Sequence, residues 1–280
     1  MSATRPLRLT PERAAEWFAV ANVAFLGVDI AIAHAENAYR VRAEWAPLVF
    51  SAAGTLLLLP MALGRGGAAW RWIEQLVGAG AVLVGVAGMV FHLHSGFFQQ
   101  QTLRNLVYSA PFVAPLAYVG VGLLLLLLRS APRSPDELGW WLLVLALGGF
   151  LGNFGLSLLD HAQNGFFRWT EWIPVVAAAF GSGFVFVLWL RPPAAPWPVV
   201  AALVACQIAV GVAGFALHLW ADWHRPAARL TDRFLFGAPA FAPLLFADIA
   251  VLAAIGVWAR AQHPQDRAAS QHDAGRRDQP

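Results

Sequence analysis

Charged residues are scarce in this sequence. Of its 280 residues, only 12% are Asp, Glu, Lys or Arg, whereas 59% are hydrophobic and the mean hydropathy is +0.58. Soluble domains usually carry roughly 25% charged and roughly 45–50% apolar residues. Half the usual charge cannot cover a surface that faces water, so the composition excludes a soluble globular domain, a disordered chain and a coiled coil.

Cysteine and lysine are also nearly missing. The single cysteine, Cys206, excludes a disulfide framework, a CxxC redox motif and a CxxCH haem attachment site. There is no lysine, so 19 arginines supply the basic charge behind a pI near 9.7. These arginines lie close to hydrophobic runs, which indicates a membrane surface and not nucleic acid as the partner.

Long apolar runs are what the sequence has in abundance. A helix of about 20 apolar residues crosses a hydrocarbon layer about 30 Å thick, because each residue rises 1.5 Å. The sequence contains eight such runs, so we predict an all-α polytopic membrane protein with eight transmembrane helices. Thr10 followed by Pro11 predicts the start of the first helix. The runs are 17–34, 46–63, 73–94, 106–128, 138–159, 173–190, 197–219 and 235–259.

The distribution of arginine predicts the orientation. An even number of spans puts both termini on one side, and twelve of the 19 arginines fall on that side. By the positive-inside rule, both termini are then cytoplasmic, in a multi-pass protein of the cell inner membrane without a removable signal peptide. The expected organisation is a cytoplasmic N-terminus (1–16), a first four-helix unit (17–128), a linker (129–137), a second four-helix unit (138–259) and a disordered cytoplasmic tail (260–280).

Three segments of the first half recur in the second half at offsets of 126 to 128 residues. Residues 34–47 and 161–174 are identical at six of fourteen positions, and residues 84–93 and 210–219 are identical at seven of ten. The chain is therefore interpreted as two copies of a four-helix unit. Because four is even, both copies have the same orientation in the membrane, related by a pseudo-twofold axis along its normal. The pairs are 34–47 with 161–174, 84–93 with 210–219, and 110–116 with 238–244.

Four histidines end alternate apolar runs and lie in the repeated segments. They are predicted to lie at similar depth on the extracytoplasmic side, where an unpartnered polar group is costly. Imidazole is a common ligand of haem iron, copper and other transition metals, and it titrates near neutral pH. Cofactor ligation, proton or substrate handling, and a structural interface all remain open for these residues, which are His34, His92, His161 and His218.

The two cofactor classes make different demands on these histidines. Haem requires two axial histidines that face each other from neighbouring helices. A copper or iron site would add carboxylates, for which the candidates are Glu44, Glu171 and Asp222. Asp222 follows His218 by four residues, so both lie on one helix face if the helix continues that far.

In architecture the chain is similar to the haem A synthase family, which has two four-helix repeats with extracytoplasmic histidines. That family places its histidines on even-numbered helices and carries loop cysteines. Here the histidines end odd-numbered runs, and Cys206 lies inside the seventh run. The resemblance is confined to architecture, and no residue role is carried over from it.

Two carboxylates lie inside predicted spans. Asp29 is in the first span and Asp248 is near the middle of the eighth. A carboxylate at membrane depth is expensive, so both are candidates for a proton relay.

Three functions therefore stay open. The leading hypothesis is a haem-binding or transition-metal-binding redox protein. The alternatives are a proton-coupled small-molecule transporter or channel, and a non-catalytic subunit that assembles with another membrane complex. The expected partner in every case is the lipid bilayer, and whether the chain is an enzyme stays open.

Overall fold

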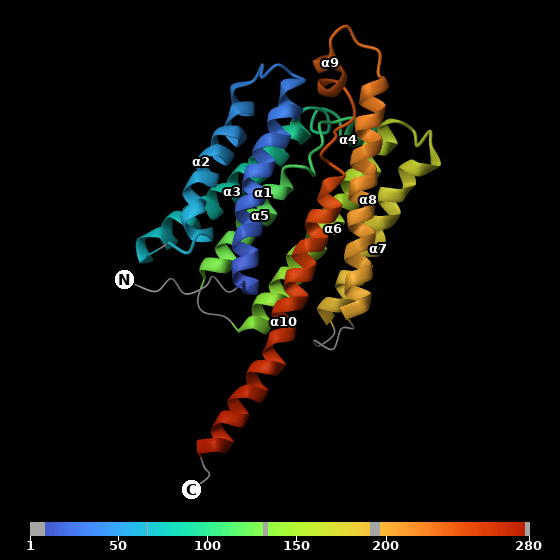
Figure 1. Cartoon of the computed structure of the whole chain (residues 1–280). Helices are drawn as coiled ribbons and strands as arrows, with labels where there is room; N and C mark the ends of the chain where they lie inside the picture. The colour runs from blue at the N-terminus through green and yellow to red at the C-terminus, as the bar shows by residue number, and fades with distance from the viewer. Residues whose placement is uncertain (1–8, 66, 131–133, 191–196, 278–280) are drawn as a thin grey trace.

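The structure is a computed structural model that describes residues 9–65, 67–130, 134–190 and 197–277. The described regular elements are all helical (Figure 1). The start of the predicted N-terminal segment and the centre of the predicted linker lie outside these residues. The elements are α1 (Pro11–Ala35), η1 (Arg42–Glu44), α2 (Trp45–Ala62), α3 (Ala68–His94), α4 (Leu103–Val107), α5 (Leu116–Arg129), α6 (Pro135–Gln163), η2 (Trp169–Glu171), α7 (Trp172–Leu190), α8 (Trp197–His224), α9 (Leu230–Leu235) and α10 (Leu244–Arg277).

Seven of the described helices are long and apolar enough to cross a membrane, where the sequence predicted eight. The difference lies in the predicted span 106–128, of which only α5, with 14 residues, is a continuous apolar helix. At 1.5 Å per residue, α5 is about 21 Å long and falls short of the hydrocarbon thickness. Pro111 and Pro115 explain the shortening, because each lacks an N–H and disfavours helix in the residue before it.

The two ends of the chain differ in how well they were predicted. The predicted helix start is confirmed, since Thr10 is the N-cap of α1 and its hydroxyl oxygen accepts a hydrogen bond from the Arg13 amide at 3.3 Å. At the other end, the sequence predicted a disordered tail over 260–280. The structure instead continues α10 as a helix to Arg277, beyond the bundle (Figure 1).

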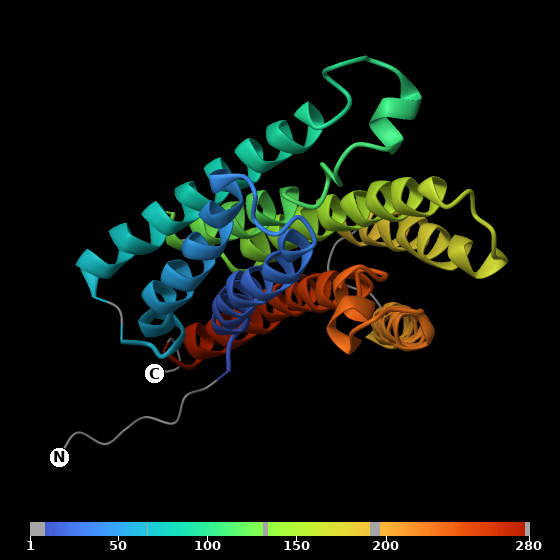
Figure 2. The same ribbon diagram turned by 90° about the horizontal axis from the view of Figure 1, so that it is seen from above.

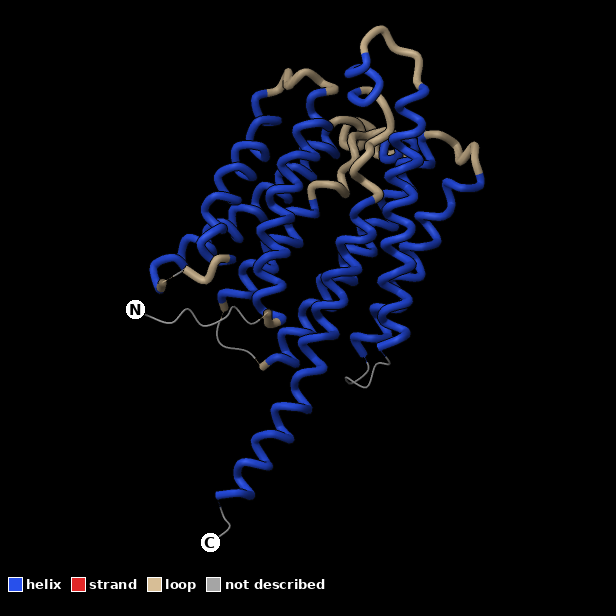
Figure 3. The backbone as a smooth tube through the Cα atoms, viewed as in Figure 1, coloured by secondary structure: helices blue, strands red, loops and turns tan. Residues whose placement is uncertain are grey.

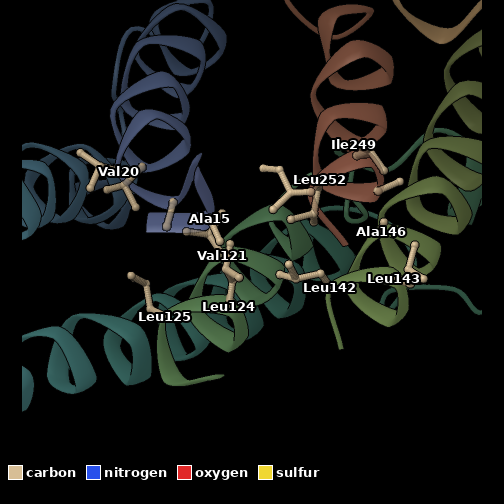
Figure 4. Packing of buried hydrophobic residues seen from close by; sticks show 14 of the residues in the cluster. Ala15, Val20, Val121, Leu124, Leu125, Leu142, Leu143, Ala146, Ile249 and Leu252 are labelled. Atoms are coloured by element: carbon tan, nitrogen blue, oxygen red, sulfur yellow. The ribbon is translucent and has the colours of Figure 1, made fainter. Parts of the chain in front are cut away.

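Four helices form the centre of the bundle. α1 packs on α10 and on α5, and α6 packs on α10 and on α5, while α2 and α3 lie to one side and α7 and α8 to the other (Figure 2). The buried core lies where the four central helices meet (Figure 4). Its labelled members are Ala15, Val20, Val121, Leu124, Leu125, Leu142, Leu143, Ala146, Ile249 and Leu252.

The element order of the first half (α1–α5) recurs in the second half (α6–α10). Each half has a long helix, a single 3-10 turn, two more long helices, a short helix and a final helix that follows two prolines. The 3-10 turns begin 127 residues apart, at Arg42 and Trp169.

The outer surface of the bundle is apolar. Leu76 and Leu83 of α3 are 71% and 70% exposed, and Phe180 of α7 is 74% exposed. Soluble proteins rarely expose large contiguous apolar patches. Together with the seven long apolar helices, this surface is that of a membrane protein.

Candidate histidine site

The predicted histidines gather at one end of the bundle. His34 is in the last turn of α1, His92 and His218 lie near the ends of α3 and α8, and His161 is near the end of α6. These four helices run to the same end, called here the histidine end, while α1 begins and α10 leaves at the opposite, terminal end (Figure 1).

Two loops fold inward at the histidine end. Residues 95–115 and 225–243 carry α4 and α9 and then run as turns to the starts of α5 and α10. These turns lie between the helices (Figure 3). Irregular backbone at membrane depth is tolerated only where protein or water satisfies its polar groups. Main-chain carbonyl groups of these turns are therefore expected to have partners in the bundle.

Histidine rings supply those partners. His92 Nδ1 lies 3.0 Å from the Pro111 carbonyl oxygen, and His218 Nδ1 lies 2.9 Å from the Pro239 carbonyl oxygen. His34 Nδ1 lies 3.2 Å from the carbonyl oxygen of Glu44. A carbonyl only accepts, so Nδ1 is the donor in each case. In the neutral ring, Nε2 then keeps a free lone pair.

The histidines approach one another within each half. The rings of His34 and His92 have centroids 6.3 Å apart. α1 and α3 each pack on α2 and α5, so this pair faces across the interior of the first half. In the second half, His161 and His218 are close enough to interact electrostatically.

Among the described residues, no group of three or more possible metal ligands is found. No three His, Cys, Asp or Glu side chains there are arranged to hold a metal ion. The structure therefore gives no support to a site in which the predicted carboxylates join the histidines.

The predicted carboxylate ligands have different surroundings. Oε2 of Glu44 and Oε2 of Glu171 are buried without a hydrogen-bond partner in the described part of the chain. Asp222 is almost fully buried, and its Oδ1 accepts a hydrogen bond from the Ala238 amide at 2.7 Å. The hydroxyl of Ser95 accepts the matching bond from the Ala110 amide at 2.9 Å. Asp222 thus fastens the loop before α10, a role that the sequence did not reveal.

Aromatic rings flank the histidines through a left-handed turn after α1. Tyr39 has a φ of 50°, and its amide closes the turn on the His34 carbonyl at 3.5 Å. Its ring lies 6.4 Å from the His34 ring and 4.5 Å from the Trp45 ring. Burial, followed by the Glu44 carboxylate, raises the pKa of Tyr39. The second half repeats this turn with Phe166 (φ 51°), whose ring lies 6.1 Å from His161 and 4.0 Å from Trp172.

The predicted relay carboxylates lie within the helices of the bundle, Asp29 on α1 five residues before His34, and Asp248 on α10. Asp248 Oδ1 accepts a hydrogen bond from Asn22 Nδ2 at 2.9 Å, which joins α10 to α1. The carboxylate of Asp29 makes no hydrogen bond within the described part, and it interacts electrostatically with Tyr118.

Sequence reasoning missed an ion cluster at the terminal end. Arg129 Nη2 donates to Glu16 Oε1 at 2.6 Å, and Arg129 Nε donates to Glu74 Oε2. These residues join α5 to α1 and α3. The available signal was that Glu74 lies just inside the third apolar run, where charges are unusual, while Glu16 and Arg129 directly border the first and fourth runs.

Comparison with models of known protein families, with curated proteins and with solved structures finds no match to this chain. Any functional conclusion therefore depends on the residues themselves.

Proposed function

We propose that this chain is a duplicated membrane protein that binds haem in each half, between His34 and His92 and between His161 and His218. Each half would contribute four membrane crossings, with α5 completing its crossing through the turn that precedes it. Both termini would be cytoplasmic, since α1 begins and α10 leaves at one end (Figure 1) and most arginines flank that end.

The repeated packing supports the duplication. The repeated segments meet in the same way in both halves, because the 84–93 and 210–219 segments each carry a histidine that donates to a proline carbonyl of the 110–116 and 238–244 segments. The helices and 3-10 turns follow the same order and nearly the same spacing.

The observation that carries the haem proposal is the geometry of His34 and His92. A metal–imidazole bond is about 2 Å long, so two histidines that held one metal atom between them would have ring centres roughly 6 Å apart. The observed centroid separation is 6.3 Å. Both rings also use Nδ1 for a main-chain carbonyl, the arrangement that orients a ligating histidine and leaves Nε2 for the metal.

A two-histidine set favours haem over a bare metal ion. Haem supplies four equatorial nitrogens itself, and when bound it provides one-electron redox chemistry. A copper or iron ion normally takes three or more protein ligands. Copper or iron held by the histidines with Glu44 or Glu171 is the less favoured assignment, because no such group of three is arranged for a metal among the described residues.

The test is an absorption spectrum and a metal analysis of protein purified from membranes in mild detergent. We expect a Soret band and two haems per chain, with one haem left in His34→Ala/His92→Ala and one in His161→Ala/His218→Ala. His94→Ala is the matched control, because the His94 ring packs on Phe98 at 5.3 Å and not on another histidine. A folded, colourless and metal-free wild-type protein would exclude the proposal and leave the transport and assembly hypotheses.

A further inference from the structure

We propose that the polar side chains that follow α1 through the bundle, together with Asp248 of α10, form a proton pathway that links the terminal end to the histidine end. The matching line of positions along α6 in the second half forms no such pathway. This proposal is independent of haem binding.

The pathway begins at the terminal end with Glu16, Glu74 and Arg129. Glu74 is 2% exposed, and Glu16 and Arg129 are 12% and 16% exposed. Two carboxylates share the Arg129 guanidinium, and Arg71 is close enough to Glu74 to interact with it electrostatically. A buried carboxylate that is not fully paired is expensive in its charged form, which favours taking up a proton from the aqueous side.

The middle of the pathway is formed by Asn22, Asp248 and Asp29. Asn22 donates to Asp248 at 2.9 Å, and Asp29 lies two turns further along α1. Ionisable residues inside membrane helices usually face protein or water and mark ion or proton routes.

The pathway reaches the histidine end through two hydroxyl groups. Tyr118 Oη lies 2.6 Å from Ser51 Oγ and donates to the Pro47 carbonyl oxygen at 3.0 Å. Tyr118 is 1% exposed and interacts electrostatically with Asp29. Hydroxyl groups both donate and accept, so this pair can take up a proton and release it. The Pro47 carbonyl only accepts a hydrogen bond, so the next proton acceptor is the Glu44 carboxylate one turn away, whose Oε2 is buried without a hydrogen-bond partner in the described residues.

Few other titratable groups surround this line. α2 has no charged side chain between Trp45 and Ala62. α9, which contacts α1, carries Asp232 and Arg233. At the opposite end, Arg13 donates to the Ala62 carbonyl oxygen at 3.2 Å.

The second half has apolar residues at the corresponding positions. The offsets of 126 to 128 residues identify the counterpart of each pathway residue on the matching helix. These positions give a proton no acceptor, so they serve as a control for the pathway positions, although the second half buries other polar side chains, among them Asn153, Ser182 and Gln207. The counterparts of Glu16, Asn22, Asp29, Ser51, Glu74, Tyr118 and Arg129 are Leu143, Gly149, Leu156, Ala178, Val200, Phe246 and Val257.

The experiment measures proton flux in proteoliposomes of the full chain that enclose a pH-sensitive dye, with a potassium diffusion potential as the driving force. We expect wild-type protein to conduct protons above protein-free vesicles. Asp29→Leu and Tyr118→Phe should each lower this flux about tenfold or more, because each removes a proton acceptor or donor from the pathway.

Both substitutions copy the residue at the corresponding position of the second half, and each replaces a polar side chain by an apolar one of similar size. The matched controls are Leu156→Val and Phe246→Leu in the second half, which should conduct like wild type. The proposal is overturned if wild-type vesicles are no more permeable than protein-free ones, or if Asp29→Leu and Tyr118→Phe conduct as wild type does. Elution as a single peak in size-exclusion chromatography verifies folding of each variant.

Discussion

In the first half, a Cβ atom added to Gly88 would come within 2.9 Å of Pro115 Cβ, and in the second half a Cβ added to Gly214 would come within 2.7 Å of Pro243 Cβ. The same close approach thus brings the third long helix of each half onto the start of its last helix. Glycine at these points lets the backbones meet, as is usual between helices in lipid. The halves therefore keep the contacts that build the frame around the histidines.

The interiors of the two halves differ. Tyr118 and Ser51 are hydrogen-bonded in the first half, whereas Phe246 and Ala178 stand at these positions in the second. The positions of the Arg129 cluster are also apolar in the second half, where Arg260 instead pairs with Asp136 at 3.1 Å. This comparison teaches that the two halves share the close contacts between helices, while each half places its buried polar side chains at different positions.

The largest effect on stability is expected from the ion cluster. Arg129→Val should lower the free energy of unfolding by about 3–5 kcal/mol, because it leaves the buried Glu74 and Glu16 carboxylates without their cation. Thermal unfolding in detergent measures the change. The triple variant Glu16→Leu/Glu74→Val/Arg129→Val, which copies the second half, should recover most of the loss. If stability does not recover, the apolar residues of the second half do not pack in the same way at these positions of the first half.

A smaller loss of stability, equal in the two halves, is expected when the glycines at the shared helix contacts are replaced. A Cβ on Gly85 would come within 2.8 Å of the Pro115 carbonyl oxygen, and one on Gly211 within 2.9 Å of the Pro243 carbonyl oxygen. Gly85→Ala and Gly211→Ala should each cost about 1–3 kcal/mol through this overpacking. Gly120→Ala is the control, since a Cβ there meets nothing within 4 Å. Unequal costs in unfolding measurements would show that the halves pack differently.

The smallest loss of stability is expected at the hydrogen bond that joins the two halves. Asn22→Ala removes the hydrogen bond to Asp248, at a cost of about 1 kcal/mol, since such bonds between membrane helices are individually weak. The symmetric positions on α6 and α5 hold Gly149 and Gly120, so only one of the two matching contacts has this bond. A double-mutant cycle with Asp248→Ala isolates the energy of the pair, and a coupling near zero would show that the bond contributes nothing.

Part of the site was predictable and part was not. The residues shared around His34 and His161 predicted that these two imidazoles correspond, and both segments form a turn with positive φ, at Tyr39 and at Phe166. The partners of the rings were not predictable. The carbonyl oxygens of Pro111 and Pro239 are available only because the chain is not helical there, and the sequence suggested a continuous span from residue 106. The ion cluster joins residues more than 50 positions apart, which no local pattern reveals.

The sequence by itself determined that this chain is helical and belongs in a membrane, because scarcity of charge and long apolar runs leave no other way to satisfy the backbone. It also predicted, through shared residues, that the two halves correspond to each other. Only the tertiary structure decided which histidines meet, where α5 begins and which buried polar side chains pair with one another. Those outcomes depend on contacts across helices, and hydropathy along a single chain carries no information about which faces will touch.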